Sequence, residues 1–182
     1  MNAETVRLTH DVVAIQIPYG DKIPLPSGAE VTITQELGGS FTVLTDRGMM
    51  VRIEAKDADA LGKKVAPVPA PASEAPTDLE GVVKRVWEQF KTCYDPEIPV
   101  NIVELGLVYE CKVAPLPEGG FGVDAKMTLT APGCGMGPVL QEEAQRKISS
   151  IPGVKHVGIE LVLDPPWEPS MMSEAARLTL GM

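Results

Sequence analysis

The first third of the chain alternates short apolar and polar runs at the spacing of β-strands. Val31-Thr32-Ile33-Thr34 alternates residue by residue, as a half-buried strand does. Phe41-Thr42-Val43-Leu44 and the run from Met49 to Ile53 follow it, separated by turns that contain glycine. Four or five such strands predict a small barrel or a meander sheet, and we expect this β-rich domain to span residues 1–65.

A proline-rich segment then interrupts the pattern at residues 66–76. Four of its residues are proline, and most of the others are small: Pro67, Pro69, Pro71 and Pro76. Such a segment forms neither a helix nor a central strand, and its preferred polyproline conformation makes it a semi-rigid spacer. We therefore expect a linker at 66–76 and a second domain over 77–182.

In the second domain the spacing of apolar residues alternates between the 3.6-residue period of helices and the two-residue period of strands. Thr77 to Glu80 fits a capping box, so the apolar residues that follow at helical spacing predict a helix that ends before Asp95-Pro96. The further pattern predicts strands at 102–113, 121–129 and 154–163 and helices at 136–150 and 173–180. The first two strands should pair as an antiparallel hairpin. The order α-β-β-α-β-α predicts an α/β sandwich with a three-stranded sheet, and the whole chain is α+β.

Composition narrows the possible partners. The net charge is −9 and the isoelectric point is near 4.7, which argues against electrostatic binding to nucleic acid or to an anionic membrane surface. No apolar run approaches the length of a membrane span, and residues 1–10 lack the apolar core of a secretory signal. A cytoplasmic location is the resulting expectation.

The cysteine pattern excludes several kinds of site. Cys93, Cys111 and Cys134 are odd in number, widely spaced and contain no CxxC pair. They predict neither a disulfide framework nor a zinc ribbon, and they cannot form a four-cysteine cluster site in one chain. Cys111 lies on the apolar side of a predicted strand and is interpreted as a core residue. The role of Cys93 stays open.

Cys134 is the candidate with the clearest chemistry. It lies in Thr130-Ala131-Pro132-Gly133-Cys134-Gly135-Met136-Gly137-Pro138, between a predicted strand and a predicted helix. The N-terminal end of a helix favours a thiolate, which is both a nucleophile and a metal ligand. The alternative is a small buried residue, but the glycines around it favour exposure. No histidine lies in a common motif with it, so a cysteine hydrolase is not expected.

Other polar residues could join a site at Cys134. Asp95 and Glu97 form a rigid acidic turn that could accept hydrogen bonds or ligate a metal, although Asp95 could equally serve as a turn residue. Thr130 ends the incoming strand and could bond the Cys134 sulfur. Trp167, in a stiff Pro-Pro-Trp loop, could cover the site or simply pack in the core.

Three blocks of the second domain resemble a known family. They are Asp95-Pro96-Glu97-Ile98-Pro99-Val100-Asn101-Ile102-Val103-Glu104-Leu105-Gly106-Leu107-Val108-Tyr109, then Thr130-Ala131-Pro132-Gly133-Cys134, then Asp164-Pro165-Pro166-Trp167 with Met172-Ser173. Their order and spacing closely resemble the iron–sulfur cluster assembly-associated (FSCA) domain and cover nearly all of 77–182. The β-rich segment ahead of a proline-rich linker is similar to the architecture of bacterial SufT proteins.

The resemblance implies an auxiliary, non-enzymatic role in maturing iron–sulfur proteins, with the assembly machinery and client apo-proteins as partners. The family's cysteine corresponds to Cys134, its acidic turn to Asp95 and Glu97, and its threonine to Thr130. Gly135 departs from the family pattern, in which proline often follows the cysteine, and this should loosen the turn. A stable cluster usually needs four protein ligands. We therefore expect Cys134 to be a transient or shared ligand, with no firmly bound cofactor, unless a second subunit or a small thiol supplies the others.

Two alternatives stay open at this point. A pure adaptor would use each domain to bind a different protein, and Cys134 would only shape its loop. A thiol redox protein would use a reactive Cys134, with Cys93 as a resolving thiol if the fold brings the two together.

Overall fold

The computed structural model describes residues 4–64 and 78–182, and contacts group the chain into two compact units. Among the described residues, the first unit comprises 4–64 and 96–99, and the second comprises 78–95 and 100–182. The predicted linker at 66–76 lies outside the described residues, so the predicted domain boundaries stay a prediction. No helix in the described ranges is long and apolar enough to cross a membrane.

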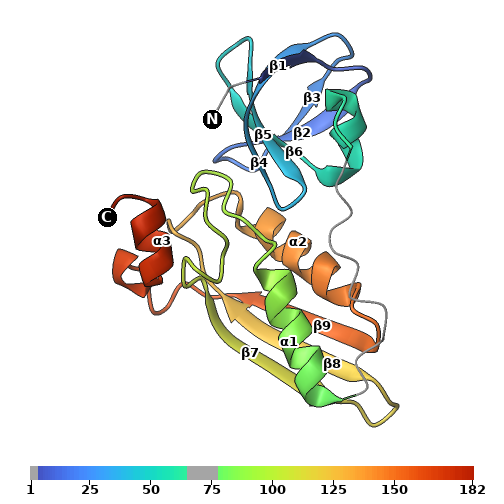
Figure 1. Ribbon diagram of the computed structural model, residues 1–182, viewed down its shortest axis with the longest axis vertical. Coiled ribbons are helices and arrows are strands. Elements are labelled where there is room, and N and C mark those ends of the chain that lie inside the picture. Colours follow the sequence, from blue (N-terminus) through green and yellow to red (C-terminus); the bar gives the residue numbers. More distant parts are fainter. Residues whose placement is uncertain (1–3, 65–77) are drawn as a thin grey trace. The chain divides into compact units, whose positions relative to one another are not determined.

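The first unit is a six-stranded antiparallel sheet (Figure 1). Its strands are β1 (Glu4–Arg7), β2 (Val12–Gln16), β3 (Lys22–Leu25), β4 (Glu30–Leu37), β5 (Ser40–Thr45) and β6 (Met50–Ile53), in the order β1-β4-β5-β6-β2-β3. The predicted meander is present as β4-β5-β6, joined by tight turns. A 3₁₀ segment, η1 (Ala55–Leu61), follows and ends at Gly62, whose φ of 69° suits glycine.

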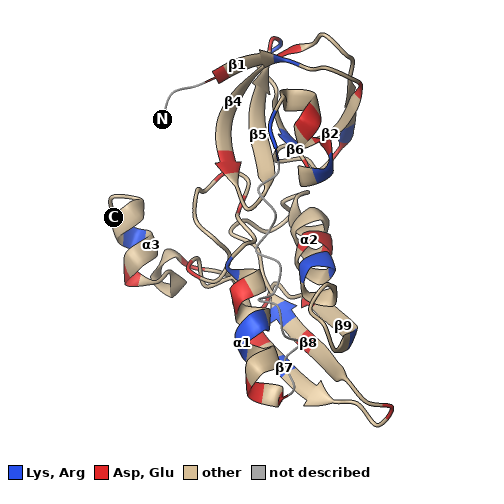
Figure 2. Cartoon of the chain, turned by 45° about the vertical axis from the view of Figure 1, so that its right-hand side comes forward, with Lys and Arg blue, Asp and Glu red and all other residues tan. Residues whose placement is uncertain are grey.

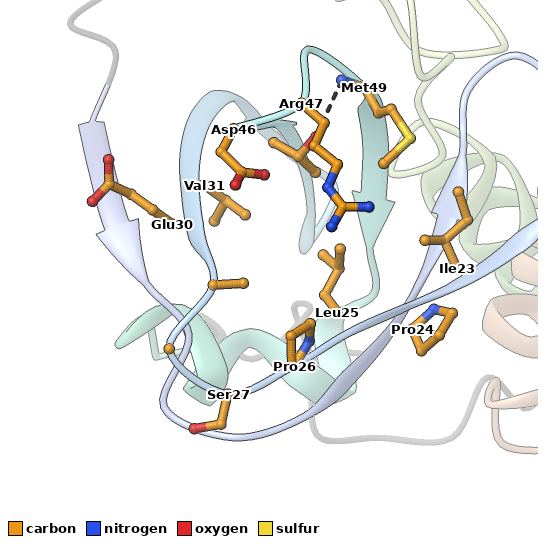
Figure 3. A pocket seen from close by; sticks show the side chains of 13 residues that line it. Ile23, Pro24, Leu25, Pro26, Ser27, Glu30, Val31, Asp46, Arg47 and Met49 are labelled. Carbon is orange, nitrogen blue, oxygen red and sulfur yellow. Dashed lines mark hydrogen bonds between the residues drawn. The ribbon is translucent and has the colours of Figure 1, made fainter.

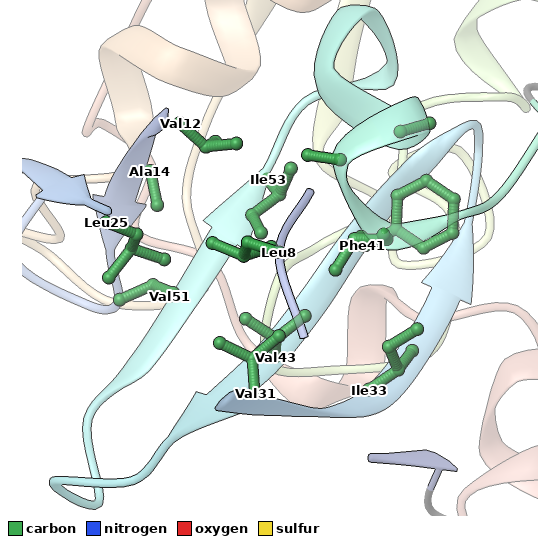
Figure 4. Packing of buried hydrophobic residues seen from close by; sticks show 13 residues of the cluster. Leu8, Val12, Ala14, Leu25, Val31, Ile33, Phe41, Val43, Val51 and Ile53 are labelled. Carbon is green, nitrogen blue, oxygen red and sulfur yellow. The ribbon is translucent and has the colours of Figure 1, made fainter. Parts of the chain in front are cut away.

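Alternate strand residues build the core of this unit (Figure 4). Val31 and Ile33 point inward from β4, and Val43 and Val51 meet them from β5 and β6. Three small or aliphatic residues of η1 join this cluster: Ala58, Ala60 and Leu61. All residues of the cluster belong to the first unit, so this sheet has a hydrophobic core of its own.

The second unit is a two-layer α/β sandwich. Its elements are α1 (Leu79–Phe90), β7 (Val108–Pro115), β8 (Phe121–Met127), α2 (Gly137–Ser149), β9 (Val154–Leu161), η2 (Pro169–Met171) and α3 (Glu174–Thr179). β7 and β8 form the predicted antiparallel hairpin, and β9 runs parallel to β8 after the crossover through α2. α1 packs against α2 and β7, while α2 packs against β9, so both helices cover one face of the sheet (Figure 1).

Charged residues of both signs occur along the strands of this sheet (Figure 2). Glu110 and Lys112 on β7, Asp124 and Lys126 on β8 and Glu160 on β9 line a shallow hollow there. The sequence pattern assigned the residues of β7 and β8 in this set to the polar side, because they alternate with the apolar ones.

The strand predicted at 102–113 was wrong at its start, because residues 102–106 form turns and β7 begins at Val108. The Asn101 side-chain oxygen accepts the amides of Val103 (3.1 Å) and Glu104 (2.9 Å), which competes with strand pairing. Gly106 follows with a φ of 73°, a conformation that no strand uses.

The predicted capping box was also wrong, although the helix itself is present. Asp78 is the N-cap of α1, and its carboxylate accepts the amide of Gly81 at 2.8 Å. Aspartate satisfies a helix N-terminus as well as threonine does, and it lies one residue closer to the first helical turn. Thr77 lies outside the described residues.

Candidate functional site

The candidate site is built around the loop from Thr130 to Met136, which joins β8 to α2. Cys134 is half-buried there, and its amide donates to the Ala131 carbonyl at 3.3 Å. Its own carbonyl accepts the Gly137 amide at 3.2 Å. Gly133 has a φ of 80° and open space around its Cα, so it shapes the turn without packing against anything. The exposed tip at Ala131 to Gly133 leaves a path for a partner to reach this loop.

The base of the loop is held tightly. Met136 is fully buried, and a Cβ on Gly137 would lie 2.7 Å from the Leu129 side chain. A larger residue at Gly137 would therefore require the Leu129 side chain to shift, because the start of α2 lies close to the end of the β8 segment. The loop therefore has a packed base at Met136 and Gly137 and an exposed tip at residues 131–133, and Cys134 lies between them.

The N-terminal end of α2 faces this loop. Met136 is the N-cap and offers no side-chain hydrogen bond to the helix, and Cys134 precedes it by two residues. The amide groups at a helix start carry partial positive charge, which favours an anion nearby. This geometry agrees with the predicted position of the thiol at the start of a helix.

Asp95 lies in a narrow hairpin at the end of α1. Its amide donates to the Val100 carbonyl at 3.3 Å, and the Ile102 amide donates to the Cys93 carbonyl at 2.9 Å. The Asp95 residue is only 6% exposed, which is unusual for a carboxylate in a turn. Glu97, by contrast, is exposed in the loop 96–99.

Backbone hydrogen bonds connect this hairpin to the strand that leads into the cysteine loop. The Leu107 amide donates to the Ile102 carbonyl at 2.9 Å, and the Thr128 amide donates to the Leu107 carbonyl at 2.8 Å. Together with the Ile102–Cys93 bond, they join three segments that are distant in sequence. These bonds run from Cys93 to Thr128. Asp95 lies two residues after Cys93 and Thr130 lies two residues after Thr128, so both are close to this hydrogen-bonded framework.

The predicted ligands do not make a closed metal site. No group of three or more His, Cys, Asp or Glu side chains in residues 4–64 and 78–182 is placed to hold a metal ion. The Thr130 hydroxyl forms no hydrogen bond within these ranges, so the predicted bond to the Cys134 sulfur is absent from the described residues. Within the described chain, Cys134 offers one thiol and not a ligand cage.

Residues 165–171 pack against the turn that precedes β7, and we call this segment the C-terminal clasp. The Trp167 indole donates to the Leu105 carbonyl at 2.8 Å, and the Tyr109 hydroxyl donates to the Pro165 carbonyl at 2.9 Å. A Cβ on Gly106 would lie 2.3 Å from the Met171 carbonyl oxygen, so the two backbones touch. Trp167 thus has a packing role, which was one of its two predicted roles. The first and third blocks of the family resemblance form one substructure.

The other two cysteines differ from Cys134. Cys93 is fully buried, and its thiol donates weakly to the Gln89 carbonyl at 3.6 Å. Cys111 is only half-buried, because β7 is an edge strand, so the prediction of a core residue was too strong. Burial still raises the pKa of the Cys111 thiol from 9.0 to about 11.

The sequence analysis missed a buried ion pair on α2. Glu143 and Lys147 are 5% and 7% exposed and lie 2.7 Å apart. The Lys147 ammonium also donates to the Thr92 carbonyl at 2.7 Å, which ties α2 to the end of α1 beside Cys93. Their i,i+4 spacing was a visible signal, but such pairs are usually on the surface. This pair positions the two helices that flank the candidate site.

Sequence matches to known proteins cover the segments that form the candidate site. The family model described as "Iron-sulfur cluster assembly protein" matches residues 84–161, which include the hairpin, the sheet and the cysteine loop. A Porphyromonas gingivalis protein named "Fe-S protein maturation auxiliary factor" is 47% identical over 96 residues, 53% of this chain and 88% of that protein. A Staphylococcus aureus protein named "Fe-S protein maturation auxiliary factor SufT" is 41% identical over 88 residues, 48% of this chain and 96% of that protein.

A solved structure supports the fold of the second unit. The crystal structure of a domain of unknown function, DUF59, from Bacillus anthracis aligns with a TM-score of 0.50 at 30% identity, over 57% of this chain and 94% of that one. The chain belongs to the iron–sulfur cluster assembly protein family, as the sequence resemblance predicted. The matched relatives are much shorter than this chain, so they do not test the predicted likeness of the β-rich unit to SufT architecture.

Proposed function

We propose that this chain is a non-enzymatic auxiliary factor in the maturation of iron–sulfur proteins, and that Cys134 makes its transient contact with a cluster. The observation that carries the proposal is the setting of Cys134, which is half-buried on an open-tipped loop at the uncapped start of α2. Cys93 is sealed in the core, and the raised pKa of Cys111 keeps that thiol protonated. The relatives are named as maturation auxiliary factors, which supports the same role.

The cluster is cargo in this proposal. A thiolate at Cys134 binds one iron, and the donor protein, the client, a small thiol or a second copy of this chain supplies the other ligands. A single ligand holds the cluster weakly, so release to a client with a full ligand set is favourable. Asp95, Glu97 and Thr130 are proposed to shape the approach to the sulfur. The proposed setting is the cytoplasm, with the assembly machinery and client apo-proteins as partners.

Anaerobic reconstitution with iron and sulfide tests the proposal. Visible absorption should show cluster uptake by the wild type, in the presence of a small thiol, and transfer of that absorption to an apo-ferredoxin added afterwards. Cys134→Ser should lose both, while Cys111→Ser, the matched control on the same unit, should keep both. Equal behaviour of wild type and Cys134→Ser would contradict the role of Cys134. If neither protein takes up a cluster, the adaptor function becomes the better explanation.

The redox alternative has less structural support. A dithiol mechanism needs a resolving thiol that can reach Cys134, and Cys93 is 0% exposed. That thiol would have to leave the core beside the Glu143–Lys147 pair before it could react.

A further inference from the structure

The first unit contains a cavity that lies outside the candidate site and outside the family match. Its volume is about 400 Å³, within the usual range for small-ligand pockets. It lies where the loop after β3 approaches the β5–β6 turn (Figure 3). The buried side chains of Leu25 and Val31 belong to the core and form the apolar wall. Ile23 and Met49, both half-buried, extend this wall toward the opening.

The Arg47 guanidinium lies above this apolar wall. Figure 3 shows the Arg47 side chain reaching from the β5–β6 turn over the opening, toward Leu25 and Ile23. Glu30 on the same rim pairs with Arg7 at 3.5 Å, whereas Arg47 forms no ion pair within the described residues. A guanidinium over an apolar pocket suits a ligand with a carboxylate at one end, because its planar fork binds carboxylates with two hydrogen bonds.

The turn that carries Arg47 is rigid. The Gly48 amide donates to the Thr45 carbonyl at 2.9 Å, and the Thr45 amide donates to the Met49 carbonyl at 2.9 Å. The Met49 amide also bonds the Thr45 hydroxyl at 3.1 Å (Figure 3). Arg47 therefore starts from a fixed backbone, which lowers the entropy lost when a ligand binds.

The adjacent sheet edge does not suit a peptide strand. Within residues 4–64 and 78–182, β3 pairs with β2 alone and its outer edge has no partner strand, but Pro24 in its middle has no amide hydrogen to donate. A strand added there would lack a ladder hydrogen bond. The features of this pocket favour a small molecule over an extended peptide.

We propose that the pocket lined by Leu25, Val31, Met49 and Arg47 binds a small amphipathic carboxylate, with its apolar body against the wall and its anionic end at Arg47. The Asp46 carboxylate on the same rim weakens this attraction and keeps the site from binding anions without an apolar part. The site is independent of the function proposed for Cys134.

Titration of the full chain with decanoate, below its micelle concentration, followed by amide NMR or calorimetry, tests this proposal. We expect saturable binding with shifts confined to the pocket residues. Arg47→Gln should weaken binding at least about tenfold, since it removes a charge-assisted hydrogen bond. Asp46→Asn should strengthen it severalfold. Both residues lie on an exposed turn, so neither variant disturbs the core.

Decylammonium and decanol serve as matched probes. Weaker binding of both supports recognition of the carboxylate. Equal binding of decanol would show a purely apolar pocket and overturn the role of Arg47. Decanoate binding that does not saturate, or that is unchanged in Arg47→Gln, would be detergent-like adsorption and would overturn the site altogether.

Discussion

The two units of this chain reach their stability in different ways. The first pairs six antiparallel strands and buries their alternate residues, so its core follows directly from the strand pattern. The second has three strands among its described residues, and helices, a buried ion pair and a C-terminal clasp pack around its apolar core. All three cysteines belong to the second unit, and the pocket at Arg47 belongs to the first. The proposed reactive thiol and the proposed ligand pocket therefore lie in different units, and the following experiments compare the two units.

The largest expected effect comes from truncating an aromatic core residue. Phe41 is 1% exposed in the first core and Phe90 is fully buried in the second unit. Phe41→Ala should destabilise the first unit by about 3–5 kcal/mol, through lost burial and the cavity left behind. Trp87 and Trp167 both belong to the second unit, so their fluorescence reports on that unit alone.

Urea unfolding, followed by circular dichroism and by fluorescence, separates the two cores. Phe41→Ala should move the circular dichroism transition and leave the fluorescence transition in place. Phe90→Ala, the mirror variant, should move the fluorescence transition. If Phe41→Ala shifts both signals together, the units unfold as one and the proposed separation is wrong.

A somewhat smaller effect is expected at the buried ion pair. Glu143→Gln leaves the Lys147 ammonium buried with its charge partner removed, which should cost about 3 kcal/mol. Replacing both residues, as Glu143→Gln with Lys147→Met, should recover much of that loss, because neither position then carries a buried charge. Fluorescence-detected urea unfolding measures both.

Glu110→Gln is the matched control for this ion pair. Glu110 pairs with Lys112 on the solvent-facing side of β7, where water screens the charges, so its removal should change stability little. Equal effects of Glu110→Gln and Glu143→Gln would show that burial does not set the strength of the α2 pair.

Two glycines with nearly the same backbone conformation compare the units most directly. Gly106 has a φ of 73° and Gly48 a φ of 74°, but a Cβ on Gly106 would meet the Met171 carbonyl while one on Gly48 meets nothing within 4 Å. Gly48→Ala should cost only the conformational penalty, about 1 kcal/mol. Gly106→Ala should cost at least about 2 kcal/mol, because the clasp must also move.

Thermal unfolding of these two variants measures the difference. A loss of the Trp167–Leu105 contact in Gly106→Ala should also shift tryptophan emission before unfolding. Equal losses of stability would mean that the C-terminal segment yields freely and does not clasp the turn.

Features that depend on neighbouring residues could be predicted from the sequence, whereas features that depend on residues far along the chain could not. The alternation at Val31–Thr34 predicted a strand, and Gly133 predicted an open turn before Cys134, because both depend on neighbouring residues. The pairing of β1 with β4 and of β2 with β6 depends on partners far along the chain, which no local period encodes. The strand start was misjudged because the Asn101 side chain captures two backbone amides that the apolar pattern assigned to a ladder.

The site shows the same division. Cys134 and its helix start could be predicted, since one short stretch contains both. The burial of Lys147 could not, because it depends on the Thr92 carbonyl at the end of another helix. The half-burial of Cys111 likewise depends on the position of β7 at the sheet edge, which is a property of the assembled sheet.

The smallest effect is expected at Cys111, where it is confined to high pH. Burial raises the pKa of this thiol from 9.0 to about 11, so in the folded protein at pH 8 about a hundredfold less thiolate is present than for an unperturbed cysteine. The stability that follows from this shift is fully present below pH 9 and is lost as the pH rises through 11, because the folded state then holds an unfavourable buried thiolate.

Alkylation with iodoacetamide between pH 7 and pH 11, read by peptide mass spectrometry, tests this assignment. Cys134 should be labelled first, Cys111 at a rate that keeps rising up to pH 11, and Cys93 only when the second unit opens, because its sulfur is sealed in the core. The urea-unfolded protein, in which all three thiols are exposed, provides the reference rates. Labelling of Cys111 as fast as Cys134 at pH 8 would show that the edge strand does not protect its thiol. Cys134 would then lose its distinction as the accessible thiol of the second unit.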